Sequence, residues 1–421
     1  MTKRVKITLS VDEQYQEWMA KQTFNNNIDE DALKETILNE LEFFSSLTVE
    51  EYTLWRKWQE IRNGKHKNDS KKLIDTIKNN IWEPKKIDDY KKLKPVLVLA
   101  SGNTKLNKIW SILRTFSCSL VNNGAIGRQR RFLVLDEKTE KYLGIICVSG
   151  DFMDLKGRDD FIGWTREDRT KKGGMLKHTA NGSSIIPMQP FGYNYNGGKL
   201  IASLVASDII EKDWEKQYGD KLVGVSTTSL YGSNSMYNSL KYWNRRGKTQ
   251  GATSFEFSKE TEEEIKEYGK NLEPYKYFEW WGAKRPNGQQ LKRDHRNRSR
   301  QYFFRKLGFK TKSLITSHSR GVYFNHLFKN TNAFLKKEIP VDELERRFDN
   351  RVETLVDIWK LGCASKRVKN LKRKGTFKMD YLFYDDLRNM KTWEEVKGRY
   401  IHQIGQHRKT EPDNQTFRIA A

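Results

Sequence analysis

The sequence is poor in the residues that build metal centres and disulfide frameworks. Its 421 residues include only 3 cysteines and 7 histidines. The cysteines, Cys118, Cys147 and Cys363, are odd in number and far apart, which favours a reducing compartment and no disulfide framework. No histidine stands beside a cysteine at zinc-ligand spacing. We therefore expect no metal site.

Long apolar runs are also missing. No stretch approaches the roughly 18 to 20 apolar residues that a membrane-spanning helix needs. The first residues, MTKRVKITLSVDEQYQEW, contain no apolar core of a secretion signal. The expectation is a soluble, cytoplasmic protein without a membrane partner.

Acidic residues are too few to balance the basic ones. The chain has 78 Lys and Arg against 54 Asp and Glu, which gives a formal net charge of +24. Such an excess predicts a polyanionic partner. A hydrophobic content of 36%, with 12% aromatics, is sufficient for at least one full-sized core, and this length is typical of two or three domains.

The pattern predicts a helical N-terminal region over residues 1–90. Apolar residues at helical spacing indicate one buried helix face, formed by Leu33, Ile37, Leu41 and Phe44. Thr48 stands three residues before Glu51, which is the pattern of a capping box at the start of a second helix. Residues 63–72 contain no apolar side chain and are the best candidate linker in this region.

The hydrophobic pattern of residues 91–255 predicts an α/β core with a mixed sheet. The expected elements are a strand at 94–101, a helix at about 104–117, a hairpin of 131–135 with 142–149, a strand at 185–191, a helix of about twenty residues after 199, a strand at 221–228 and a helix at 235–243. Strands separated by a helix are expected to pair in parallel, whereas the hairpin adds an antiparallel pair.

The rest of the chain carries most of the charge imbalance. We expect a basic, aromatic extension at 256–335 and a helical region at 336–421. Residues 284–312 hold eleven Lys or Arg against the single Asp294, and a second basic block lies at 366–378. Basic residues interleaved with aromatics provide phosphate contacts and stacking faces for a nucleic acid, DNA rather than RNA, although a solvated charged face is the alternative. The candidate nucleic-acid-binding residues are Lys284, Arg285, Lys292, Arg293, Arg296, Arg298, Arg300, Tyr302, Phe303, Arg305 and Lys306.

A turn at 193–199 precedes the long predicted helix. A helix N-terminus that follows a strand can hold a phosphate, so this turn is a candidate cofactor site. The same residues also make an ordinary strand-to-helix connection, and that alternative is favoured for the turn taken by itself. The candidate cofactor-binding residues are Asn194, Asn196, Gly197, Gly198 and Lys199. Neither the dinucleotide fingerprint nor the P-loop is present.

This order of strand, turn, long helix, strand and short helix resembles the core of the GNAT acyltransferases. The resemblance implies acyl-CoA as the cofactor and a tyrosine, Tyr237 or Tyr242, as the general acid. Packing in the core is the alternative for both tyrosines. The sequence departs from the family where Lys199, rather than a spaced third small residue, follows the two glycines.

A closer resemblance covers residues 141–251. The segments YLGIICVSGD, RDDFIGW, IIPMQPF, LIASLVAS, KDWEKQYGDKLVGV and YWNRRGKTQG occur in the order and at the spacing of the domain family that includes the A component of the Druantia antiphage system. The similarity extends through 313–335. The matched positions are Arg158, Asp159, Gly163, Trp164, Asp213, Trp214, Trp243, Gly247, Thr249 and Gly251.

The Druantia resemblance implies a role in DNA-related conflict between bacteria and phages, with protein partners in a defence or phage complex. Related proteins often carry an acidic residue near the end of the strand at 221–228, where this chain has Ser226, Thr227 and Thr228. No catalytic acid can be transferred to those positions.

Two adjacent carboxylates are the candidates for a general base. Asp159 and Asp160 lie beside Phe161 and Trp164, and an aromatic wall raises the pKa of a carboxylate by excluding water. The alternative is a surface salt bridge from Arg158 to a neighbour.

The favoured interpretation is a nucleic-acid-binding protein of phage or bacterial origin with a GNAT-like core, acting as a DNA-modifying, acyltransferase-like enzyme or a phage-defence component. The alternative is a non-catalytic DNA- or RNA-binding subunit of a larger assembly. A nuclease or transposase has less support because no set of paired carboxylates for two metal ions stands out.

Overall fold

A computed structural model describes residues 9–24, 28–121, 127–171, 173–229, 235–249, 252–254, 256–291, 295–310, 315–317, 320–379 and 383–405. These residues divide into two compact units. The first unit takes the described residues up to 52 together with those between 252 and 317, and the second takes those of 53–249 and 320–405. The first unit is therefore built from two stretches that are far apart in the sequence.

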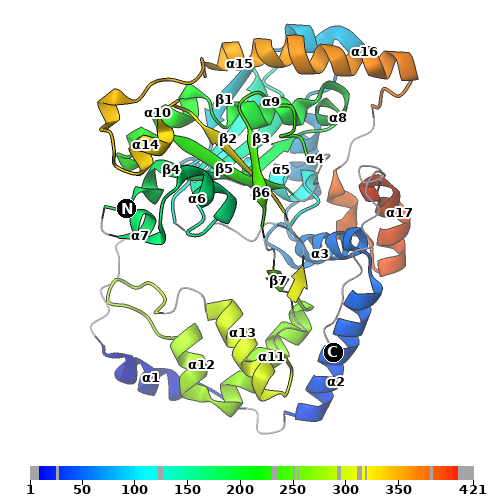
Figure 1. The fold of residues 1–421 in the computed structure, drawn as a ribbon. Helices are drawn as coiled ribbons and strands as arrows, with labels where there is room; N and C mark the ends of the chain where they lie inside the picture. The colour runs from blue at the N-terminus through cyan, green and yellow to red at the C-terminus, as the bar shows by residue number, and fades with distance from the viewer. Residues whose placement is uncertain are drawn as a thin grey trace. The chain divides into compact units, whose positions relative to one another are not determined.

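A seven-stranded mixed sheet forms the centre of the second unit (Figure 1). Its strands lie in the order β1-β2-β3-β4-β5-β9-β6. All neighbours are antiparallel except β4 and β5, which are parallel. The strands are β1 Pro95–Leu99, β2 Gln129–Asp136, β3 Tyr142–Gly150, β4 Thr179–Pro187, β5 Gly224–Ser229, β6 Asn244–Lys248 and β9 Gly321–His326. An α/β fold with a mixed sheet is thus confirmed.

Helices lie before and between these strands in the chain. They are α3 Val49–Asn63, which begins in the first unit, α4 Lys71–Asn79, η1 Ile87–Lys92, α5 Thr104–Ser117, α6 Lys156–Ile162, α7 Arg166–Thr170, η2 Met175–His178, α8 Phe191–Tyr195, α9 Gly197–Leu204 and α10 Asp208–Tyr218. The predicted helix after residue 199 is divided into α9 and α10. Ser207 has an extended backbone, and α10 starts anew after it.

The C-terminal part of the second unit is helical. It comprises α14 Thr331–Leu335, η5 Val341–Glu343, α15 Val352–Ile358, η6 Trp359–Ala364, α16 Ser365–Lys374, η7 Tyr384–Arg388 and α17 Trp393–Gly405. The elements α15, η6 and α16 follow one another without a break and run as one rod past α9 and α8 (Figure 1). The middle of this rod, η6, has π-helical geometry, which is rare and often marks a functional position.

The first unit consists of helices and one small ribbon. Its elements are α1 Val11–Met19, α2 Glu30–Ser46, α11 Lys259–Leu272, α12 Pro274–Trp281, α13 His295–Lys306 and the antiparallel pair of β7 Ala252–Ser254 with β8 Ile315–Ser317. The four apolar residues predicted to face the core are the buried residues of α2. The capping box before α3 is confirmed, because Thr48 Oγ1 accepts from Glu51 N at 3.2 Å and Thr48 N donates to Glu51 Oε2 at 2.8 Å.

Three local expectations differ from the structure. The hairpin is confirmed as β2 and β3. Strands β1 and β2 are antiparallel although a helix separates them, with Leu99 opposite Phe132 and Pro95 opposite Asp136. Residues 235–243 form turns instead of a helix, with a left-handed Ser239 at φ 62°, since their aromatics pack inward. The strand expected at 185–191 is the end of β4, which runs from Thr179 to Pro187, and Phe191 already begins α8.

Candidate functional site

A buried ionic cluster surrounds the predicted base Asp159. Arg158 is fully buried and lies 2.8 Å from a carboxylate oxygen of Asp151 and 2.6 Å from one of Asp159. Trp164 Nε1 donates to Asp159 at 2.9 Å, and Arg169 lies 3.4 Å from its second oxygen. Three side chains, those of Arg158, Trp164 and Arg169, therefore already surround the carboxylate. Arg158 thus forms a salt bridge, as the alternative held, but the pair is buried and does not lie at the surface.

The ionic cluster also ties the sheet together. Asp151 directly follows β3, and its carboxylate accepts a hydrogen bond at 3.0 Å from Ser226 on β5. Leu155 N donates to Asp159 Oδ2 at 2.9 Å, which orders the start of α6. Asp160, in contrast, is exposed on α6. The sequence brought Arg158, Asp159 and Trp164 to attention but did not indicate Asp151 or its bond to Ser226.

The two predicted tyrosines have different environments. Tyr237 is buried against Trp243 and Tyr323, with both ring centroids at 5.1 Å, and burial raises the pKa of its hydroxyl. A buried phenol with a raised pKa is a reluctant proton donor at neutral pH. Tyr242 is half-buried and stacks on Phe348 with centroids 3.7 Å apart.

The predicted phosphate turn lies at the junction of α8 and α9 and contacts the C-terminal rod. Asn194, Gly197 and Gly198 are buried, and Asn196 has a left-handed φ of 52°. Trp359 Nε1 donates to the carbonyl of Tyr195 at 3.0 Å. These contacts describe a turn that is covered by protein.

The polar side chains of this turn bind neighbouring chain. Asn194 Oδ1 accepts from Lys378 N at 3.1 Å, and Asn196 Nδ2 donates to the carbonyl of Cys363 at 3.4 Å. Lys199 Nζ donates to the carbonyl of Asn238, and burial lowers the pKa of Lys199. The turn therefore reaches both η6 and the segment after α16.

The first basic block lies in the first unit and is partly neutralised there. Arg300 pairs with Glu262 at 3.0 Å, and Lys306 pairs with Glu273 at 2.8 Å. Tyr302 is half-buried and donates its hydroxyl to Glu273 at 2.7 Å. The acidic residues of this unit thus supply counter-charge within the protein itself.

Exposure decides which residues of this block can contact a partner. Phe303 is 1% exposed and packs on Trp280 at 5.8 Å between ring centroids, so its ring belongs to the core and offers no stacking face. Lys284, Arg298 and Arg305 are exposed, whereas Arg285 donates to the carbonyl of Leu291 at 3.1 Å. Lys292 and Arg293 lie outside the described residues, as does the side chain of Arg296.

The second basic block forms α16, whose charges are on one side. Val368 and Leu371 are buried and attach the helix to the second unit. The exposed cations are Lys366, Lys369, Lys372, Arg373 and Lys374. In the described part of the chain four of these cations have no ion pair, and Lys372 lies 3.2 Å from Asp88. The charge of this block is visible in the sequence, but the candidate nucleic-acid-binding residues were all taken from residues 284–312.

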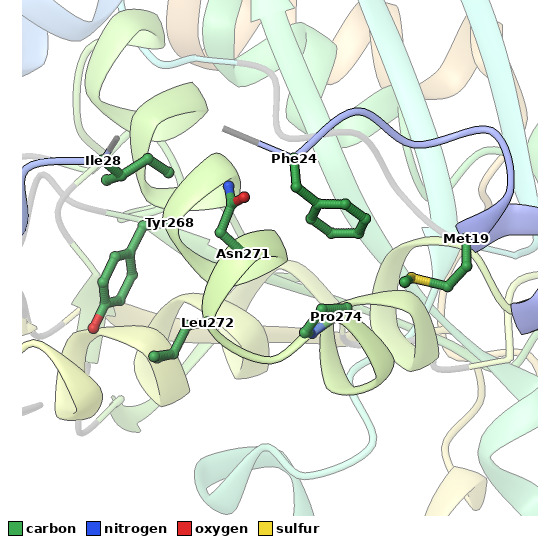
Figure 2. Close-up of a pocket in the computed structure, with 7 residues that line it drawn as sticks. All are labelled: Met19, Phe24, Ile28, Tyr268, Asn271, Leu272 and Pro274. Carbon is green, nitrogen blue, oxygen red and sulfur yellow. The ribbon is translucent and has the colours of Figure 1, made fainter. Parts of the chain in front are cut away.

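An apolar groove of about 480 Å³ lies in the first unit, at the junction of α11 and α12. Figure 2 shows Met19 and Phe24 on the side of Pro274, whereas Leu272 is drawn beside Tyr268. Asn271 lines it too, and its buried side-chain oxygen has no hydrogen-bond partner among the residues that the structure describes. None of the sequence-predicted site residues lies in this groove.

A Ser–His–Asp arrangement was missed by the sequence analysis. His66 Nδ1 lies 2.7 Å from Asp69 Oδ2, and His66 Nε2 lies 2.8 Å from Ser111 Oγ. These residues resemble a catalytic triad in their contacts, but Ser111 is 2% exposed inside α5 and no substrate can reach it. The arrangement anchors the apolar-free segment at 63–72, which is therefore more than a linker.

Within the described residues, no helix is long and apolar enough to cross a membrane, and no group of three or more His, Cys, Asp or Glu side chains is placed to hold a metal ion.

Comparisons with known proteins identify the family. The family model described as Druantia protein DruA matches residues 47–337, a range that contains the whole sheet but not α16. The Druantia protein DruA of Escherichia coli (strain UMEA 4076-1) is 26% identical over 262 residues, which cover 58% of this chain and 62% of that protein. This chain thus spans less than two thirds of that relative's length, and no solved structure matches. Because the family match covers more than half of its length, the chain belongs to the Druantia protein DruA family.

Proposed function

We propose that this protein binds nucleic acid, DNA rather than RNA, as a component of an antiphage system of the Druantia type. Family membership supports the biological setting. The observation that carries nucleic-acid binding is α16, where six Lys or Arg stand in ten residues without an acid. The buried face of the helix holds it on the protein while five cations face the solvent.

The physical argument is electrostatic. Unpaired cations on one helix repel each other, and a phosphate backbone relieves that repulsion while releasing condensed counterions. On duplex DNA each phosphate contact contributes about 0.9 to the slope of log affinity against log salt. Nucleic-acid binding through α16 therefore predicts a steep and measurable salt dependence.

The test compares two triple variants of equal charge. The first replaces Lys366, Lys369 and Arg373 by Gln. The matched control also uses Gln and replaces Lys71, Lys105 and Lys138, which are exposed and form no ion pair in the described part of the chain. Fluorescence anisotropy is measured with duplex DNA, single-stranded DNA and RNA between 50 and 200 mM salt.

We expect the α16 variant to lose affinity and to reduce the slope on duplex DNA by about 2 to 3, in proportion to the contacts removed. The control should keep the wild-type slope. Equal slopes for wild type and the α16 variant would refute binding through this helix. Tighter binding of RNA than of DNA would reverse the proposed preference.

A second proposal concerns chemistry in the sheet, and the β4–β5 pair favours it. These parallel strands pair only from Thr179↔Gly224 to Asn181↔Ser226, after which β4 continues to Pro187 without β5. The strands, the intervening turn and α9 follow the order of the GNAT acyltransferase core. We propose on this basis an acyl-CoA-dependent modification of a DNA base or another amine.

The covered turn weakens this second proposal, because Gly197 and Gly198 are buried. Isothermal titration calorimetry with acetyl-CoA at low salt tests it directly. Saturable binding, with a new modified nucleoside detected by mass spectrometry in cells that express the protein, would support an enzyme. Absence of both, with nucleic-acid binding intact, would leave a non-catalytic DNA- or RNA-binding subunit.

A further inference from the structure

Three basic side chains from distant parts of the sequence meet beside α6. Arg246 comes from β6, His326 ends β9, and Arg347 lies between η5 and α15. The guanidinium carbon of Arg246 lies 3.4 Å from the ring centroid of Phe161, and the His326 ring lies 5.5 Å from the same centroid. Phe161 thus forms a shared apolar wall for Arg246 and His326.

Hydrogen bonds orient two of these groups. Arg347 Nη1 donates to the carbonyls of Tyr242 and His326, both at 3.2 Å, and lies 3.3 Å from His326 Nδ1. Because a guanidinium can only donate, His326 Nδ1 accepts and the ring carries its proton on Nε2. His326 Nε2 has no hydrogen-bond partner among the described residues and remains a donor.

No acid balances this basic cluster. In the part of the chain that the structure describes, Arg246, His326 and Arg347 form no ion pair with a carboxylate. Arg246 Nε is buried and has no hydrogen-bond partner there. A buried donor without a partner loses its hydration without compensation, so the arrangement is complete only with an acceptor.

The protonation equilibria agree with an excess of positive charge. Burial, together with the fields of Arg347 and Arg246, lowers the pKa of His326 to about 4. Burial also lowers the pKa of Arg246, and burial and Arg246 lower that of Arg347. The shifts have the direction expected for cations that repel one another and lack an anion.

We propose that Arg246, His326 and Arg347 form an anion site that takes a phosphate group. Guanidinium groups bind phosphate through charge-assisted, often bidentate hydrogen bonds, and the imidazole Nε2 adds a third donor. The phosphate is free, carried by a nucleotide, or located at the end of a nucleic acid. This site lies on elements other than α16 and does not depend on the proposed function.

Calorimetric titration of the full chain with sodium phosphate, at constant ionic strength, tests the site. The variants are Arg246→Gln and Arg347→Gln, and the control is Arg245→Gln. Arg245 is the neighbouring, exposed arginine of β6, so its replacement removes the same charge without changing the cluster. Deoxynucleoside monophosphate, and oligonucleotides with and without a 5′-phosphate, distinguish the sources of the phosphate.

We expect saturable phosphate binding by the wild type and a loss of about tenfold or more in each cluster variant, as charge-assisted hydrogen bonds are removed. Arg245→Gln should bind like the wild type. Without phosphate, Arg246→Gln should unfold at the same or a higher temperature, because repulsion is relieved. This second readout keeps the test decisive if Arg347→Gln folds poorly. No saturable binding by the wild type, or an equal loss in Arg245→Gln, would overturn the proposal.

Discussion

Replacing Asp159 by Asn separates a structural role of this carboxylate from a catalytic one. Its partner Arg158 is fully buried, with the closest oxygen of Asp159 at 2.6 Å. An Asn keeps the shape and an oxygen that can still accept from Trp164, but it removes the negative charge. The change therefore tests the ion pair itself.

The magnitude follows from the environment of the cluster. Charge centres about 4 Å apart attract by about 4 kcal/mol at an effective dielectric constant of 20. Arg158 keeps Asp151 at 2.8 Å, so the loss is incomplete, while Asn is cheaper than Asp to bury. We expect Asp159→Asn to lower the free energy of unfolding by about 2 to 4 kcal/mol, near the range for breaking a buried pair.

Urea unfolding followed by tryptophan fluorescence measures this loss, with the transition of the second unit analysed separately. Asp160→Asn is the matched control, since Asp160 is the exposed neighbour on the same helix, and its cost should stay within about 0.5 kcal/mol. A cost below about 0.5 kcal/mol for Asp159→Asn would refute the ionic argument. Loss of a modification activity at unchanged stability would instead favour the general base.

Two further predictions concern acid sensitivity and packing. His326 has a folded pKa of about 4, below the unfolded value of about 6.5, so its contribution to stability is complete above pH 6.5 and is lost as the pH falls towards 4. After allowance for screening, His326→Gln should reduce the drop in the free energy of unfolding between pH 7 and pH 5 by about 1 kcal/mol. Urea unfolding at both pH values measures this drop, and an unchanged drop in the variant would contradict the prediction. Gly197→Ala would place its Cβ 2.3 Å from the buried Phe191 ring and should lower the free energy of unfolding by about 1 to 3 kcal/mol. Gly198→Ala would meet the flexible side chain of Met236 at 3.0 Å and should lower it less. Equal melting temperatures for the two variants would argue against this packing.

The sequence predicted well those features that depend on neighbouring residues. The buried face of α2, the capping box at Thr48, the β2–β3 hairpin and the strand β1 are confirmed because helical period, cap spacing and strand alternation each lie within a few residues. The prediction of a helix at 235–243 was wrong because residues distant in the sequence decide the structure there. Tyr237 and Trp243 pack into the core, and that tertiary demand outweighs the helical pattern.

Parts of the candidate sites depended on contacts between distant segments. Phe303 lies in a basic stretch and was predicted to stack on a nucleic-acid base, but its ring is buried against Trp280. His66 lies in a segment without apolar residues, yet it is 3% exposed, and Ser111 and Asp69 bind its two ring nitrogens. No local pattern shows such burial, since desolvation depends on which segments meet.

The sequence by itself determined the excess positive charge, the location of its two basic blocks, the α/β class and the family resemblance, because composition, period and motif spacing are written in chain order. Only the tertiary structure decided that β9, about 90 residues after β5, lies between β5 and β6, and that Arg246, His326 and Arg347 meet without an acid. It also decided that the charges of α16 face the solvent while those of α13 are partly neutralised. Pairing, burial and neutralisation are properties of groups brought together in space, and their free energies depend on distances that chain order does not contain.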